Sequence, residues 1–174
     1  GNPVMGPRFL TIFILLLLTC GHGATQASGG EILDYTLRVS FDIPASRISG
    51  LAKIPVQGGQ EIKLNKGTLQ LIDIRLDGQR IDFSRQDEFV RIFPPRPGVM
   101  EIRYAGTFNS PKPSHGALEQ GALNVPSDGI DGRGIFLTGI WYPQPDQVCN
   151  YHLTAILPDG YEAISEAETI RKTT

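Results

Sequence analysis

Cysteine is scarce in this sequence, and neither sign of charge dominates it. The 174 residues include two cysteines, Cys20 and Cys149, too few for a disulfide-rich scaffold or for a zinc site made of cysteines alone. Sixteen basic and 18 acidic side chains give a formal net charge of −2, so no overall basic field favours nucleic acid. What is present is ordinary for one globular domain, with 40% hydrophobic and 20% charged residues.

Catalytic patterns are also missing. The three histidines are His22, His115 and His152, and none belongs to an H-E-x-x-H pair of zinc ligands. His115 and Glu119 are four residues apart, but two ligands alone make a weak metal site. No G-x-S-x-G nucleophile motif occurs. We therefore predict no catalytic residue, no metal ligand and no cofactor in this chain.

The longest apolar run lies near the N-terminus and is short. Arg8 precedes the apolar residues 9–18, and small residues follow at 21–27. A bilayer span needs about 20 apolar residues, so this pattern predicts a cleavable secretory signal helix over 1–27, with a buried core helix as the other explanation. The protein is then exported to the periplasm or the extracellular space. Cys20 leaves open a lipoprotein signal, in which the acylated cysteine anchors the chain to a membrane, although Thr19 is a poor residue before it.

Residues 28–174 form one predicted domain that alternates with period two. Apolar residues at 35, 37, 39, 41 and 43 enclose polar ones, which indicates a strand with one buried face. Similar patterns predict strands at 48–56, 61–64, 72–76, 79–83, 89–93, 100–104, 134–141, 151–157 and 161–165. No later window favours a helix, and the 20 Gly and 13 Pro are typical of many turns. The expected fold is all-β, an antiparallel β-sandwich or a saddle-like two-sheet domain.

Two features of this domain suggest a binding surface. A loop is predicted over 105–133, and loops of that length are either functional or mobile insertions. Trp141 and Tyr142 stand at a strand end, where they either contact a sugar or peptide or anchor the packing of the two sheets. Cys149 is expected to be a small buried hydrophobic residue.

Several segments, in their order, resemble the N-terminal β-domain of the aminopeptidase N family of zinc metallopeptidases. Each motif is short, and it is their order over about 32–166 that carries the resemblance. The motifs are Tyr35 to Asp42, Ile48-Ser49-Gly50, Leu69 to Gly78, Met100 to Gly106 with its Tyr-x-Gly end, Trp141-Tyr142-Pro143, and Tyr151 to Ser165.

The resemblance implies a non-catalytic domain that packs on a helical zinc catalytic domain of the same or a split protein and walls its cleft for peptide substrates. In the family that catalytic domain carries the H-E-x-x-H motif and follows at about the position of Thr174, so the chain is expected to be truncated and inactive alone. Gly116 to Gln120 is a near-match to the family's G-A-M-E-N motif, which makes Glu119 a candidate substrate contact. It precedes the last strands, however, and we interpret it as a coincidence. Two alternatives stay open, a free-standing glycan- or peptide-binding module and an envelope lipoprotein with a structural role.

Overall fold

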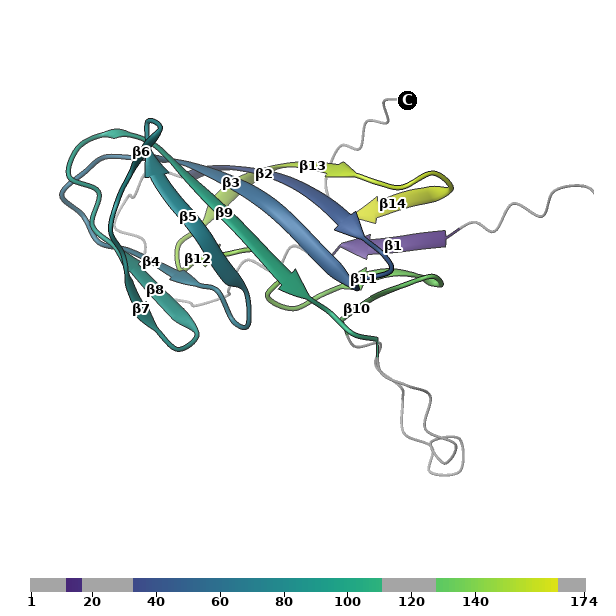
Figure 1. Ribbon diagram of the computed structural model, residues 1–174. Coiled ribbons are helices and arrows are strands. Elements are labelled where there is room, and N and C mark those ends of the chain that lie inside the picture. Colours follow the sequence, from purple (N-terminus) through teal and green to yellow (C-terminus); the bar gives the residue numbers. More distant parts are fainter. Residues whose placement is uncertain (1–11, 17–32, 111–127, 166–174) are drawn as a thin grey trace, which may run out of the picture.

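The computed structural model describes residues 12–16, 33–110 and 128–165, and within these ranges the protein is all-β (Figure 1). A six-stranded sheet, here called the long sheet, has the order β13-β2-β3-β9-β5-β6. Its strands are β13 (Cys149–Ile156), β2 (Leu33–Asp42), β3 (Arg47–Val56), β9 (Gly98–Thr107), β5 (Gln70–Leu76) and β6 (Gln79–Arg80). The described residues contain no helix long and apolar enough to cross a membrane.

Two four-stranded sheets accompany the long sheet. One has the order β12-β4-β8-β7, from β12 (Gln144–Pro145), β4 (Ile62–Asn65), β8 (Phe89–Ile92) and β7 (Ser84–Gln86). The other has the order β10-β11-β1-β14, from β10 (Gly129–Asp131), β11 (Gly134–Leu137), β1 (Ile12–Leu16) and β14 (Tyr161–Ser165). In Figure 1 the strands β4, β7 and β8 lie toward one end of the long sheet and β1, β10, β11 and β14 toward the other.

The alternation of the sequence explains the long sheet directly. In β2 the side chains of Tyr35, Leu37 and Val39 are buried, and the residues between them are more exposed. The strands β3 and β9 repeat this pattern, so their buried faces join one core with residues of the small sheets, such as Leu64 and Ile135. Burying one face of each strand also fixes the register, because a slip of one residue would turn the apolar set toward water.

Two sequence motifs meet where β3 and β9 pair. Gly50 is the register partner of Tyr104, and a Cβ at Gly50 would fall inside the Tyr104 ring. The Tyr104 ring therefore occupies the space where a side chain at position 50 would begin, and only glycine leaves it enough room. The Tyr104 hydroxyl is buried and has no hydrogen-bond partner among the described residues.

Aromatic side chains fill the core around Tyr35. The rings of Tyr35, Tyr142 and Tyr151 are 5.6–6.0 Å apart pairwise, and Trp141 packs on Tyr142 at 4.7 Å. The Tyr35 hydroxyl donates a hydrogen bond to the Pro143 carbonyl oxygen, and the Tyr142 and Tyr151 hydroxyls lie 2.9 Å apart. Burial raises the pKa of the Tyr35 phenol well above its ordinary value, so it stays a donor.

The structure confirms the predicted all-β class and most of the expected strands, with three differences. First, β13 runs parallel to β2, so the long sheet is mixed. Second, both ends of the loop predicted over 105–133 are strand, since β9 continues to Thr107 and β10 occupies Gly129–Asp131, whereas residues 111–127 lie outside the described ones. Third, the strand expected over 134–141 ends at Leu137, because Asp128 accepts the backbone N–H groups of Thr138 and Gly139 and turns the chain there.

The N-terminal segment is described over five residues only. These form β1, which pairs in parallel with β11 and with β14. The rest of 1–27, including Cys20, lies outside the described residues. The signal peptide and the lipid anchor therefore stay predictions.

The turn between β5 and β6 depends on an aspartate. Asp77 and Gly78 both have positive φ, 46° and 81°, as a two-residue hairpin turn of type I′ requires. The Asp77 carboxylate accepts the Val99 backbone N–H at 2.8 Å and pairs with Arg96. The hydrogen bond from the Val99 N–H has the larger effect and the one from Arg96 the smaller, and together they hold the pKa of the Asp77 carboxyl below its usual range.

We predict that the two core tyrosines respond oppositely to loss of their hydroxyls. Tyr35→Phe leaves the Pro143 carbonyl without its donor and is expected to lower the free energy of unfolding by about 1 kcal/mol. Tyr104→Phe removes a buried hydroxyl that pairs with nothing described, so it is expected to be neutral or stabilising. Urea unfolding of both variants measures the difference, and an equal loss in both would contradict this account of the core.

We also predict an acid-sensitive contribution from Asp77. Because its pKa is lower in the folded protein, it stabilises the fold above the unfolded pKa of about 4, and this is lost as pH falls through the folded value. Asp77→Asn keeps a residue that tolerates positive φ but removes the charge, so its unfolding free energy should change less between pH 7 and pH 3. Denaturant titrations of both proteins at the two pH values test this, and parallel pH dependences would disprove it.

Candidate functional site

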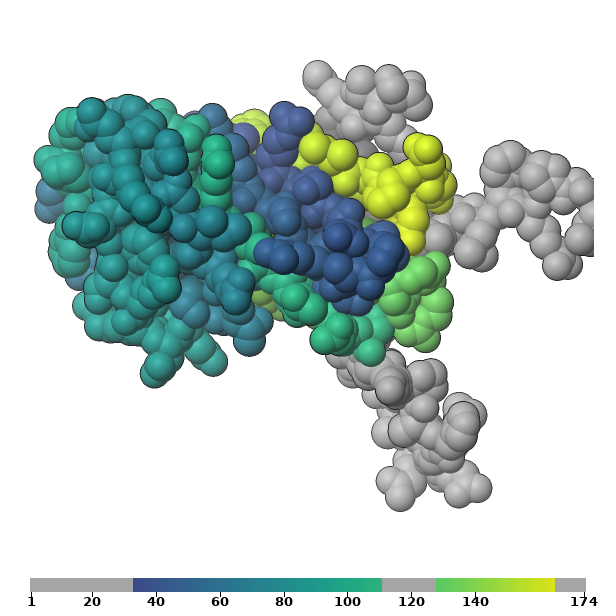
Figure 2. Space-filling model, viewed as in Figure 1, coloured from purple at the N-terminus to yellow at the C-terminus, as the bar shows by residue number. Residues whose placement is uncertain are grey.

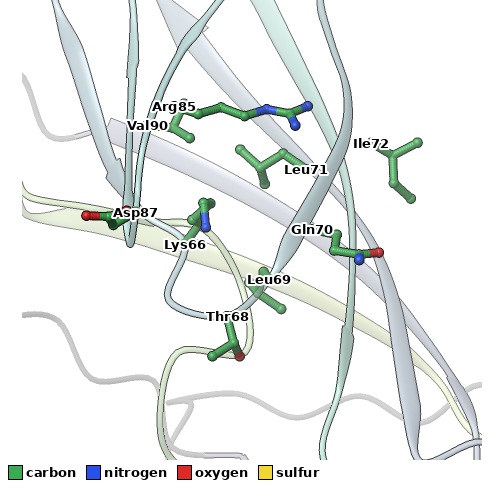
Figure 3. A pocket seen from close by; sticks show the side chains of 9 residues that line it. All are labelled: Lys66, Thr68, Leu69, Gln70, Leu71, Ile72, Arg85, Asp87 and Val90. Atoms are coloured by element: carbon green, nitrogen blue, oxygen red, sulfur yellow. The ribbon is translucent and has the colours of Figure 1, made fainter.

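A hollow of about 500 Å³ lies beside β5, β7 and β8 (Figure 3). The loop before β5 supplies one side, and the hairpin of β7 and β8 supplies the other. Its lining residues are Lys66, Thr68, Leu69, Gln70, Leu71, Ile72, Arg85, Asp87 and Val90. Apolar side chains from β5 and β8 form its buried part, since Leu69, Leu71 and Val90 belong to the core.

Polar groups line the outer part of the hollow. The Lys66 ammonium donates to the Gly67 carbonyl at 3.1 Å, and the Arg85 guanidinium lies 5.0 Å from the centre of the Phe83 ring. Neither cation forms an ion pair within the described part of the chain, and the Asp87 carboxylate lines the same hollow. Charged groups of both signs at the opening of an apolar hollow can hold a polar ligand.

Trp141 and Tyr142 do not lie at the surface. Both side chains are 0% exposed, in the aromatic core next to Tyr35. They lie on the chain between β11 and β12, where the Tyr142 ring contacts Tyr35 of β2. The structure thus gives them the packing role, and the stacking surface that contact with a ligand would need is not found at these residues.

The other singled-out residues divide between described and undescribed parts. Glu119, His115 and Cys20 lie outside the described residues, so nothing in the structure bears on a substrate or lipid role for them. His152 is exposed on the polar face of β13, and Cys149 is buried, as expected of a small hydrophobic residue. Across residues 12–16, 33–110 and 128–165, no group of three or more His, Cys, Asp or Glu side chains could hold a metal ion.

The hollow was missed at the level of sequence. Arg85 and Asp87 belong to β7 and its turn, a segment of exposed polar residues without the apolar alternation that marks a strand. Lys66 and Thr68 precede a strand that was expected to begin at residue 72 rather than at Gln70. Only the pairing of β7 with β8 brings these residues opposite β5.

No family model matches the chain, and no curated protein matches it. Among solved structures it is similar to the M1 zinc metallopeptidase from Deinococcus radiodurans, at 24% identity and a TM-score of 0.38 over 45% of this chain and 21% of that one. A mutant of that enzyme bound to a Tyr-Ser-Ala substrate is similar at 18% identity and a TM-score of 0.49, over 72% of this chain and 32% of that one. Leukotriene A4 hydrolase from Saccharomyces cerevisiae is similar at 18% identity and a TM-score of 0.36, over 44% of this chain and 15% of that one. The chain thus spans less than a third of each of these M1 metallopeptidases, and the likeness concerns the fold of that part.

Proposed function

We propose that this chain is the non-catalytic N-terminal β-domain of a secreted, aminopeptidase-N-like zinc metallopeptidase. It packs on a helical catalytic domain, of the same or a split protein, and forms one wall of the cleft that receives the peptide substrate. In this proposal the zinc belongs to that catalytic domain, which carries the H-E-x-x-H motif in the family that the sequence resembles. The residues of this chain then supply the folded domain and the surface that packs on the catalytic domain.

The observation that carries the proposal is the way the separate sequence motifs meet. Gly50 of one motif contacts Tyr104 of another. Tyr35 of the opening strand donates to Pro143 of the Trp-Tyr-Pro motif, and Tyr142 contacts Tyr151 of the closing one. The motifs therefore belong to one core, as the resemblance requires of a single domain.

Exposed apolar side chains outside the long sheet offer contacts for a partner domain. Phe93, just after β8, is 61% exposed, and Val148, just before β13, is 69% exposed. Ile164 in β14 is 40% exposed. Apolar groups of this size in water favour association with another surface, and we assign Phe93 and Val148 to the contact with the catalytic domain.

Activity measurements test the function. We expect the purified chain to contain no stoichiometric zinc and to leave aminoacyl anilides intact. Mixed with a separately expressed helical polypeptide from the same source that carries H-E-x-x-H, it should form a complex and raise hydrolysis at least tenfold. Stoichiometric zinc with turnover by the chain alone would disprove the proposal, as would the failure of the two polypeptides to associate.

Docking variants test the surface. Phe93→Ser and Val148→Ser are each expected to weaken association with the catalytic polypeptide about tenfold, because each removes a large apolar side chain from the contact. Val99→Ser is the matched control, since Val99 is 43% exposed but stands on the outward face of the long sheet. Isothermal calorimetry gives the affinities. Equal weakening in all three variants would show that the contact lies elsewhere.

A further inference from the structure

The outward face of the long sheet carries a concentration of positive charge. Strand registers place five exposed cations there, in two neighbouring rows across the strands. In one row, Lys53 of β3, Glu101 of β9, Arg75 of β5 and Arg80 of β6 are successive register partners. In the next row, the successive partners are Arg38 of β2, Leu51 of β3, Arg103 of β9 and Asp73 of β5. We call this set the basic face: Arg38, Lys53, Arg75, Arg80 and Arg103. Figure 2 shows atoms of β2 and β3, in blue, at the surface of the molecule.

Two carboxylates neutralise only part of this charge. Glu101 pairs with Lys53 at 2.6 Å, and Asp73 pairs with Arg75 at 2.5 Å and with Arg80 at 3.1 Å. Five cations and two carboxylates leave an excess of three positive charges. Arg38 and Arg103 form no ion pair within the described ranges, although they stand only two strands apart, about 10 Å.

The margins of the same face do not cancel the excess. Asp34, Asp42 and Arg47 occupy outward positions at the strand ends, two carboxylates and one cation. Including them, the outward face still carries an excess of two positive charges. The whole chain has a net charge of −2, so the positive charge is concentrated on this face and the rest of the chain is acidic.

Two exposed isoleucines lie beside the cations. Ile156 of β13 is 45% exposed and shares the outward side with Thr154, the register partner of Arg38. Ile72, which also borders the hollow described above, is 53% exposed at the bulge between Leu71 and Asp73, and Figure 3 shows its side chain on the side of β5 away from Leu71. The face therefore combines basic and apolar side chains, the composition of protein surfaces that lie on lipid headgroups.

We propose that the basic face docks on an anionic phospholipid bilayer. Arg38 and Arg103 contact headgroup phosphates, and Ile72 and Ile156 reach the boundary with the acyl chains. Docking on a flat bilayer needs a basic surface that extends over several strands, and the basic face extends from β2 across the sheet to β6. Binding of single-stranded nucleic acid is favoured by aromatic side chains on which the bases stack. No Phe, Tyr or Trp occupies a described outward position of the long sheet. This docking is independent of the proposed catalytic partner.

Vesicle sedimentation of the full chain tests the docking. We expect binding to vesicles of phosphatidylcholine with about a third phosphatidylglycerol to exceed binding to pure phosphatidylcholine, and to weaken as salt is raised. Arg38→Gln with Arg103→Gln should lower the partition coefficient about 20-fold. Any binding by the apolar residues 9–18 is common to both vesicle types and cancels in the comparison.

A matched control separates the face from net charge. Lys63→Gln with Arg91→Gln removes the same two charges from β4 and β8, where Lys63 lies over the Phe89 ring and Arg91 pairs with Glu61 instead of facing outward on the long sheet. This pair should lower the partition coefficient less than about threefold. Arg38→Lys with Arg103→Lys keeps the charge and should retain binding, which excludes misfolding as the cause of a loss.

Three outcomes overturn the proposal. One is an equal loss in the face and control variants. Another is equal binding to the two vesicle types. The third is binding of a single-stranded oligonucleotide at concentrations where anionic vesicles are not bound, which would make the face a nucleic-acid surface.

Discussion

The packing of tyrosine rings between the long sheet and the segment beneath it holds this protein together. Tyr35 contacts Tyr142 and Tyr151, and Tyr104 lies over Gly50. Each ring buries a large apolar area and brings a hydroxyl into the core, where an unpaired polar group is costly. Pro143 satisfies the hydroxyl of Tyr35. The irregular chain between β11 and β12 is therefore held in the core by the Pro143 carbonyl and by the rings of Trp141 and Tyr142.

The aromatic core also gives the two faces of the long sheet different properties. Inward side chains of the long sheet are committed to the core, which leaves its outward side chains free to carry charge. The average composition conceals this, because the acidic residues elsewhere cancel the cations of the basic face. A chain of slightly negative net charge can thus present a positively charged surface, and the period-two alternation of the strands is what gathers that charge on one side.

The sequence predicted the strands well where apolar and polar residues alternate over several positions, as in β2, β3 and β9. It failed where structure depends on distant contacts. The parallel pairing of β13 cannot be seen in its own residues, because the same alternation suits either direction. For Trp141 and Tyr142 the sequence left both ligand contact and core packing open, because they belong to no strand and no period shows which way they point. The hollow near Arg85 was missed because β7 is polar and short, and it becomes a strand only by pairing with β8.

The parallel alignment of β13 beside β2 determines the order in which the chain can assemble. The hydrogen-bonded side chains of Asp34 and Asn150 are 116 residues apart, whereas β2 and β3 follow one another directly. Local hairpins form early, and closing so long a separation comes late and slowly. One edge of β2 therefore stays open during synthesis until residues near 150 have been made. A chain that finishes folding so late is kept unfolded for longer, and its open edge is where premature pairing with another copy would begin.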